Sequence, residues 1–344
     1  MRFRLYLVIL FAVVSLTASA HHVVEQDGYY EVEHSWEYNG KKCSIELNIN
    51  TELYNYYQIE REHLAYRYQF NGGEIPPNYY SFMLSEHDRP VIRALANEFS
   101  SHVATEKEQI QLALTFVQSL PYAYDSATKA TDEDLRYPIE TLVDGCGDCE
   151  DKVALLAALL YEMDVDFILL ILPEHIALGV NCDGVAANRY LLFQGKHYYY
   201  METTMEGWQM GQIPEDYYDA EIEAVPVDAT PGLLFKGVRF ESQSTLVFQK
   251  AMCNLELDLH NLGPGKVTEL RAHVLVIEKG RRNRLLAEEY FSLNDMQEGE
   301  QRTETLSLKS LIKENSVLRV ELTGAEIEPQ TYEVGLNYSR SQRY

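Results

Sequence analysis

A cysteine, a histidine and a glutamate are spaced along the chain in a way that suggests joint action on an amide bond. Cys149 precedes the uninterrupted apolar run 153–160, and a helix that begins at this cysteine would place partial positive charge beside the thiol. His175 follows 26 residues later, and Glu202 follows after another 27. A cysteine at a helix start can have its pKa lowered from about 8.5 towards ~3.5–7.5. The sequence therefore predicts a nucleophilic thiolate at Cys149.

Each of the three residue types has a role in this chemistry. A thiolate that attacks a carbonyl needs a base that later acts as an acid, and His175 can supply it. A carboxylate must hold the imidazole in one tautomer, and Glu202 can accept a hydrogen bond from the second ring nitrogen. We therefore predict a Cys149–His175–Glu202 triad. Backbone N–H groups at the helix start would stabilise the oxyanion, with Gln118 and Tyr122 as candidate side-chain donors.

Three stretches of chain must position the triad. The first is the apolar helix that begins at Cys149, and the other two are strand-like runs over 174–180 and 198–204. Residues alternate between two faces of a strand, so His175 would lie on one face of its strand and the larger aliphatic side chains on the other. A further apolar strand is predicted over 167–172. Helices that pack on an antiparallel sheet define an α+β fold class.

Three sequence motifs resemble those of the transglutaminase-like superfamily. They are Gly-Asp-Cys-Glu-Asp around Cys149, His-x-Ala-Leu-Gly-Val from His175 and Tyr-x-Glu-Thr-Thr around Glu202, and the resemblance covers about residues 85–220. It implies a papain-like core, with Cys149 as nucleophile, His175 as base and Glu202 where the family more often has Asp. It also implies a cysteine peptidase or amidase of the exported bacterial type, acting on a protein or peptide substrate.

Acidic residues surround the cysteine, at Asp148, Glu150 and Asp151. Their charges disfavour a thiolate, although they can also cap the N–H groups of the helix start. The triad chemistry itself requires no cofactor. Bacterial periplasmic cysteine proteases of the resembled superfamily carry a similar Asp-Cys-Glu-Asp segment and depend on calcium, so the resemblance implies a calcium ion at these carboxylates as an alternative.

Other functions fit some of the same residues. The triad would also permit acyl transfer to an amine instead of water, and an inactive site would leave an envelope-binding or scaffold module. Cys146 and Cys149 form a C-x-x-C pair, which is typical of redox proteins when a buried strand leads into it. Here the preceding segment is mixed in polarity and contains Pro138, so the redox function is disfavoured. Trp208 is a candidate cleft residue, and packing in the core is the alternative for it.

The first 20 residues have the pattern of a secretory signal peptide. Arg2 and Arg4 precede the apolar run 5–16, and Ala18-Ser19-Ala20 matches a cleavage site. We therefore predict export to the periplasm or the extracellular space. No later segment approaches the ~18 apolar residues that a membrane-spanning helix needs, so we expect no integral membrane segment after cleavage.

The rest of the chain divides by composition. We predict an N-terminal β-rich segment over 21–84, a transglutaminase-like catalytic domain over 85–224, a linker over 225–234 and a β-sandwich over 235–344. Alternating runs with turn signals between them predict the sandwich and favour an immunoglobulin-like type. Asn39-Gly40 between two alternating runs predicts a hairpin in the first segment.

Charge and cysteine content restrict the partners. The 344 residues carry a formal charge of −24, which becomes −26 when the two leader arginines are removed. Such a surface repels phosphate backbones, so nucleic acid is excluded as a partner. Five cysteines leave at least one thiol unpaired within the chain. The sequence does not choose among the pairings of Cys43, Cys146, Cys182 and Cys253.

Overall fold

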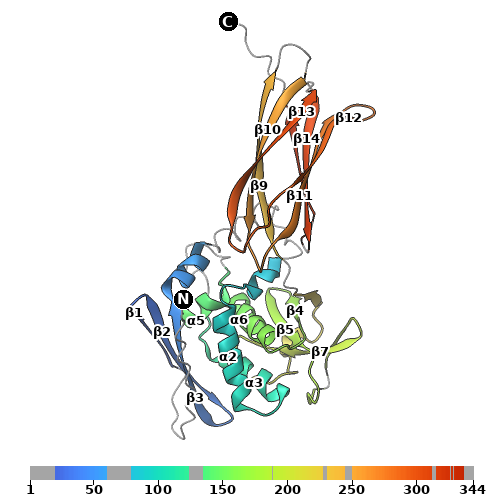
Figure 1. The fold of residues 1–344 in the computed structure, drawn as a ribbon. Coiled ribbons are helices and arrows are strands. Elements are labelled where there is room, and N and C mark those ends of the chain that lie inside the picture. Colours follow the sequence, from blue (N-terminus) through green and yellow to red (C-terminus); the bar gives the residue numbers. More distant parts are fainter. Residues whose placement is uncertain are drawn as a thin grey trace. The chain divides into compact units, whose positions relative to one another are not determined.

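The computed structural model separates into two compact units, residues 1–229 and 230–344 (Figure 1). We describe each unit by itself. The structure describes residues 20–59, 79–123, 135–187, 189–227, 231–244, 250–311, 315–325, 327 and 329–336. The predicted signal peptide therefore lies outside the described residues, except for Ala20. No helix in the described part of the chain is long and apolar enough to cross a membrane.

The first unit combines helices with two antiparallel sheets, which confirms the α+β class. Its helices are α2 (Arg89–His102), α3 (Glu106–Ser119), α5 (Pro138–Asp144) and α6 (Cys149–Glu162), with 3-10 turns η1 (Tyr79–Leu84) and η2 (Glu215–Tyr217). Its strands are β1 (Ala20–Gln26), β2 (Tyr29–Tyr38), β3 (Lys41–Asn50), β4 (Phe167–Leu172), β5 (His175–Val180), β6 (Leu191–Phe193), β7 (Lys196–Met201) and β8 (Glu223–Pro226).

Helix α6 is the centre of this unit. It contacts α2, α3, α5 and β5, so it is surrounded on all sides (Figure 1). All ten residues from Asp151 to Leu160 are buried, which explains why the apolar run contains no polar face. The predicted start at Cys149 is confirmed: the Asp148 side chain accepts hydrogen bonds from the N–H groups of Glu150 and Asp151.

The larger sheet has the order β6-β7-β5-β4-β8, with every neighbour antiparallel. Strand β4 has the predicted bounds and β5 begins one residue later than predicted; together they form a hairpin in which Leu172 pairs with His175. Strand β7 ends at Met201, so Glu202 lies one residue beyond it. The hairpin therefore presents His175 at the start of one strand, and the neighbouring strand β7 presents Glu202 at its end.

The N-terminal sheet β1-β2-β3 packs on the helices. Its β2–β3 hairpin turns at Asn39-Gly40, both with positive φ, as predicted. The Trp36 ring on β2 lies 5.2 Å from that of Phe116 on α3, measured between ring centroids. After these three strands, residues 51–59 of the segment predicted to be β-rich are helical. There Tyr57 is fully buried with its ring 4.4 Å from that of Tyr137, so tertiary packing decides the local structure.

The second unit consists of two antiparallel sheets that enclose one apolar core. The sheets are β13-β10-β9 and β12-β11-β14-β15. The core combines leucines of β10 and β13 with aliphatic residues of β11 and β14. The strands are β9 (Leu233–Ser244), β10 (Lys250–Asn261), β11 (Thr268–Glu278), β12 (Arg284–Ser292), β13 (Gln301–Leu311), β14 (Ser316–Ala325) and β15 (Gln330–Leu336). An immunoglobulin type remains a prediction for this sandwich.

Candidate functional site

Tight backbone packing fixes the segment that leads to Cys149. The Gly147 N–H donates to the Pro121 carbonyl (3.2 Å), and the Ala123 N–H donates to the Gly147 carbonyl (3.1 Å). A Cβ atom on Gly147 would lie 2.6 Å from the Cβ of Asp151, so only glycine fits here. The backbone just before the first turn of α6 is therefore held in one conformation. Tyr122 lies beside Gly147, with which it forms an isolated β-bridge.

The Cys149 thiol lies between the start of α6 and the start of β5. The backbone N–H groups of Ile176 and Glu150 lie close enough to the sulfur to lower the pKa of the thiol. The structure therefore brings Cys149 next to the strand residue that directly follows His175. This contact across 27 residues supports the predicted pairing of cysteine and histidine.

The thiol pKa differs from the expectation. Burial raises the pKa of Cys149 to about 12, and the carboxylates of Asp148 and Glu150 add to the increase. The two backbone N–H groups lower it, as the helix start was expected to do, but they do not compensate for the burial and the acidic neighbours. These contacts by themselves favour the neutral thiol.

The structure brings His175 and Glu202 together. The Nε2 of His175 lies 3.3 Å from the Oε2 of Glu202, and both side chains are largely buried. The same oxygen accepts from the Tyr200 hydroxyl at 2.8 Å, and Oε1 accepts from the N–H of Thr204 at 2.9 Å and from its hydroxyl. Burial alone would raise the pKa of Glu202, but the hydrogen bonds from His175 and Thr204 lower it to about 2.

Tyr217 covers the histidine. The two rings are parallel within 2° and their centroids lie 5.2 Å apart. Tyr217 belongs to η2, at the end of the loop that leaves β7 after Glu202. Sequence analysis did not identify this residue, because no local pattern indicates which of the many tyrosines folds back onto His175.

Gln118 does not serve the role proposed from the sequence. Its Nε2 donates to the carbonyls of Glu202 (2.7 Å) and Trp208 (3.0 Å), so its donor nitrogen is already engaged and cannot stabilise an oxyanion. It instead connects α3 with the backbone of the triad glutamate. This contact joins residues 84 positions apart and could not be predicted from spacing.

Lys152 is a second buried polar residue that was not anticipated. It lies one turn after Cys149, is completely buried, and donates through Nζ to the carbonyls of Leu120 (2.8 Å) and Gln118 (3.3 Å). Burial lowers its pKa to about 8 although Glu202 and Glu206 oppose this shift. The lysine thus fastens the end of α3 to the nucleophile helix.

Two of the three acidic residues around Cys149 are engaged within the protein. Asp148 caps the helix, and Asp151 forms a buried ion pair with Arg136 while also accepting from the Asp148 N–H. A calcium ion requires six or more oxygen ligands. In the described residues no group of three or more metal-ligating side chains occurs.

The pairing and burial of the cysteines are relevant to the redox alternative, in which Cys146 and Cys149 act as a C-x-x-C pair. Within the described part of the chain Cys43, Cys146, Cys149 and Cys182 form no disulfide with one another, and the Cys253 side chain lies outside that part. Cys43 and Cys182 are buried, and burial raises the pKa of each to about 11. The residues that precede Cys146 form α5, so no buried strand leads into the C-x-x-C pair.

Comparisons with known proteins find no close relative. No family model matches the sequence, and no curated protein matches it. Among solved structures, the putative ApaA protein from Bordetella pertussis aligns with 33% of this chain and 98% of its own, at 15% identity and a TM-score of 0.26. A red sea bream transglutaminase aligns with 98% of this chain and 78% of its own, at 8% identity and a TM-score of 0.21. Scores this low assign no family.

Proposed function

We propose that this chain is an exported thiol hydrolase of transglutaminase-like type that cleaves an amide bond in a protein or peptide. The observation that carries the proposal is the His175–Glu202 contact, in which a buried carboxylate held by Tyr200 and Thr204 orients the imidazole. The next residue of the strand, Ile176, brings its backbone N–H to the cysteine at the helix start. Nucleophile, base and orienting group are the three parts of a catalytic triad.

The geometry assigns separate roles to the two ring nitrogens of His175. Because Nε2 donates to Glu202, the proton of the thiol would pass to Nδ1. The sulfur then attacks the carbonyl carbon, and the Cys149 N–H, which the Asp148 cap does not use, would stabilise the oxyanion. The imidazolium gives its proton to the departing amine and leaves a thioester. Water, deprotonated by His175, completes hydrolysis.

The raised thiol pKa limits this scheme to a thiolate–imidazolium pair. Burial and two carboxylates disfavour an isolated thiolate at Cys149. An adjacent imidazolium would stabilise it, and the Glu202 carboxylate would in turn stabilise the imidazolium. The same raised pKa favours the second candidate function, a binding or scaffold module without chemistry.

Transfer of the acyl group to an amine would use the same residues and would show as incorporation of a labelled amine.

The rate of iodoacetamide alkylation at Cys149, followed against pH by mass spectrometry, tests the proposal. We expect Cys149 to react below about pH 7, as ion-paired thiols do, and to lose this reactivity in His175→Ala but not in the control His102→Ala. If Cys149 titrates as an ordinary or a less acidic thiol in all three proteins, the result would contradict the hydrolase and support the binding module. A requirement for reductant before labelling would favour the redox alternative.

A further inference from the structure

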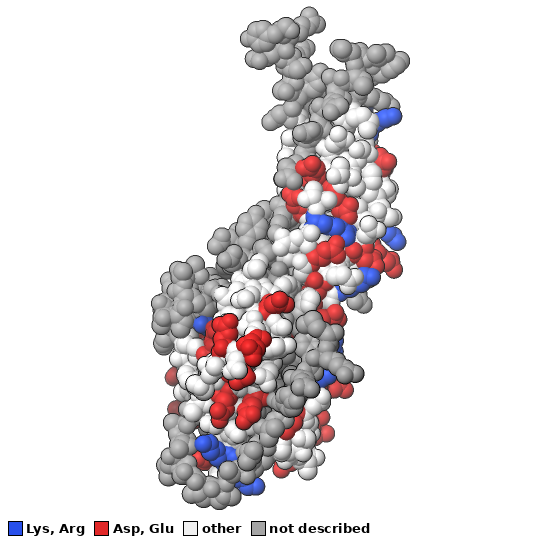
Figure 2. All heavy atoms as spheres, turned by 60° about the vertical axis from the view of Figure 1, so that its left-hand side comes forward, with Lys and Arg blue, Asp and Glu red and all other residues white. Residues whose placement is uncertain are grey.

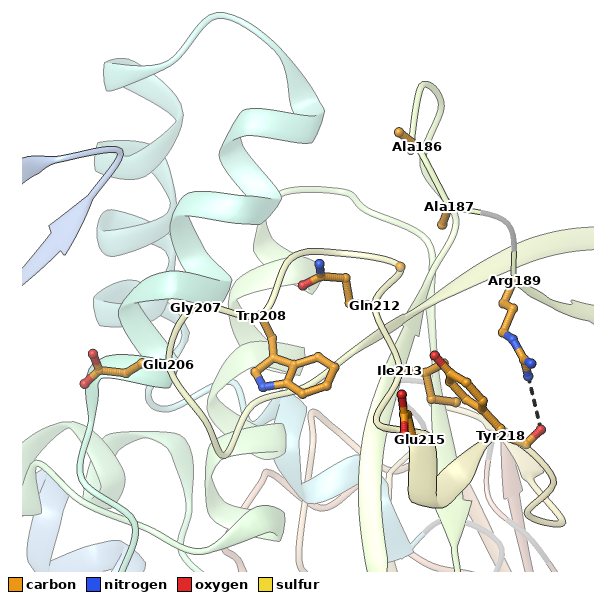
Figure 3. A pocket seen from close by; sticks show the side chains of 11 residues that line it. Ala186, Ala187, Arg189, Glu206, Gly207, Trp208, Gln212, Ile213, Glu215 and Tyr218 are labelled. Atoms are coloured by element: carbon orange, nitrogen blue, oxygen red, sulfur yellow. Dashed lines mark hydrogen bonds between the residues drawn. The ribbon is translucent and has the colours of Figure 1, made fainter.

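A pocket of about 660 Å³ opens in the loop that connects the triad glutamate with the tyrosine covering His175 (Figure 3). Residues 206–215 of this loop provide most of its lining, with Arg189 and Tyr218 on a further wall. In Figure 3 the indole of Trp208 points towards the side of the pocket that carries Ile213 and Glu215, while the Glu206 carboxylate points away. The loop that provides most of the lining therefore follows Glu202 and precedes Tyr217 in the chain.

The backbone that carries Trp208 is held firmly. Its carbonyl accepts from Gln118 Nε2 at 3.0 Å and from Gln111 Nε2 at 3.4 Å. The N–H of Met210 donates to Gln111 Oε1 at 3.0 Å, and the N–H of Gly211 donates to the Tyr200 carbonyl at 2.8 Å. Trp208 itself is only half-buried. A fixed loop that presents a partly exposed aromatic ring into a cavity is typical of a preformed binding site.

The charged side chains that line the pocket are negative on balance, because the carboxylates of Glu206 and Glu215 outnumber the single guanidinium of Arg189. Arg189 keeps its positive charge, and its guanidinium lies 3.8 Å over the Tyr218 ring and donates to the Tyr218 carbonyl at 3.3 Å. Glu215 is exposed and, in the part of the chain that the structure describes, has no ion-pair partner. Asp216 and Glu174 add negative potential at Tyr217. Apart from the pocket, acidic side chains gather on the face of the first unit drawn in Figure 2.

We propose that this pocket binds a lysine or arginine side chain of the substrate polypeptide, an inference that rests on the amide hydrolase proposed above. The methylene stem would pack on the Trp208 indole, and the cationic end would lie near the Glu215 carboxylate. Aromatic rings attract cations through their faces, and a carboxylate at the pocket wall adds a direct charge pair. The pocket would thereby select substrates with a basic residue near the scissile amide.

Calorimetric titration of the full chain carrying Cys149→Ala tests the pocket without any chemistry. The ligands are capped hexapeptides in which one residue of an alanine background, moved through all six positions, is lysine, arginine, norleucine or glutamate. At one position we expect lysine and arginine to bind about fivefold or more tighter than norleucine. Glu215→Gln should remove this preference, whereas Glu289→Gln, on the second unit, should not.

Further outcomes separate the two proposals. Trp208→Ala should weaken the lysine and norleucine peptides alike, because both stems lose the indole. Equal binding of lysine and norleucine at every position, a preference that survives Glu215→Gln, or no millimolar binding of any basic peptide would overturn the pocket proposal. Peptide hydrolysis by the wild-type protein is measured in a separate assay. A lysine preference without turnover contradicts the hydrolase alone, and turnover without a preference contradicts the pocket alone.

Discussion

At the scale of single residues, Glu202 differs from an ordinary strand carboxylate because both of its oxygens are engaged. His175 and Tyr200 donate to one oxygen and Thr204 donates twice to the other, while the side chain is almost fully buried. These contacts fix the carboxylate despite the extra methylene that distinguishes Glu from the Asp more usual in the resembled family. The imidazole of His175 consequently has one defined partner at Nε2.

Removal of the Glu202 charge should impair the site more than shortening of the side chain. In Glu202→Gln the amide can present a donor to His175, so the wrong tautomer is favoured, and we expect kcat/KM to fall by about 10²–10⁴. Glu202→Asp keeps the acceptor and should retain more activity. The measurement is hydrolysis of a peptide substrate, with Cys149 alkylation as a second readout. Equal activity of Gln and Asp variants would contradict the orienting role.

The same carboxylate should make the first unit sensitive to acid. The folded-state pKa of Glu202 is about 2, below its ordinary 4.5, so the unfolded chain takes up the proton more readily as the pH falls. Its contribution, of about 3 kcal/mol, is complete above pH ~4.5 and is lost between pH ~4.5 and ~2. Urea unfolding of wild type and Glu202→Gln over this range measures it. Parallel pH dependences in the two proteins would contradict the pKa assignment.

At the scale of elements, the end of α3 joins the parts of the site. Lys152 on α6 donates to carbonyls at this end, and Gln118 donates from it to the Glu202 carbonyl. Helix α6 and the segment after β7 are therefore connected through the end of α3. A change in α3 can for this reason reach Glu202 without any contact to His175.

Gln118 and Gln111 provide a matched pair to test this connection. Both donate to the Trp208 carbonyl, but Gln118 also donates to the Glu202 carbonyl. Gln118→Ala should cost about 1–3 kcal/mol of stability because buried carbonyls lose their donor, and it should lower Cys149 alkylation near neutral pH. Gln111→Ala should leave alkylation close to wild type. Equal effects of the two variants on alkylation would show that α3 acts only through the Trp208 loop.

At the scale of the whole molecule, the chain consists of two units with separate apolar cores. Leu155 on α6 is fully buried in the first unit, and Leu318 on β14 is fully buried in the core of the second. Each unit excludes water from its own set of side chains, so each has its own source of stability. The acid-sensitive groups of the site, Glu202 among them, belong to the first unit alone.

Scanning calorimetry of the full chain should therefore show two transitions. Leu155→Ala should lower one and Leu318→Ala the other, each by about 5 °C or more, because a buried leucine replaced by alanine costs about 2–5 kcal/mol. The Glu202→Gln variant should change only the transition that Leu155→Ala lowers. A single transition that both leucine variants shift would contradict independent units.

Local signals in the sequence determined most of the elements. The Asp148 cap, the Thr105 capping box at the start of α3 and the Asn39-Gly40 turn act over two to four residues, so the order of residues alone reveals them. The spacing of Cys149, His175 and Glu202 likewise indicated which helix and which strands position the candidate site. In the sandwich, β12 has weak local signals, because most of its residues are exposed and show little alternation.

Tertiary structure decided what no local pattern encodes. The helix at 51–59, the ring of Tyr217 on His175 and the donation from Gln118 to the Glu202 carbonyl all depend on contacts between residues distant in sequence. The thiol pKa is the clearest case. The helix start by itself lowers it, but the depth of burial, which only the complete fold sets, raises it much further. The sequence determines which ionisable groups are available. Packing determines their partners and their charge, because desolvation depends on everything that surrounds a group.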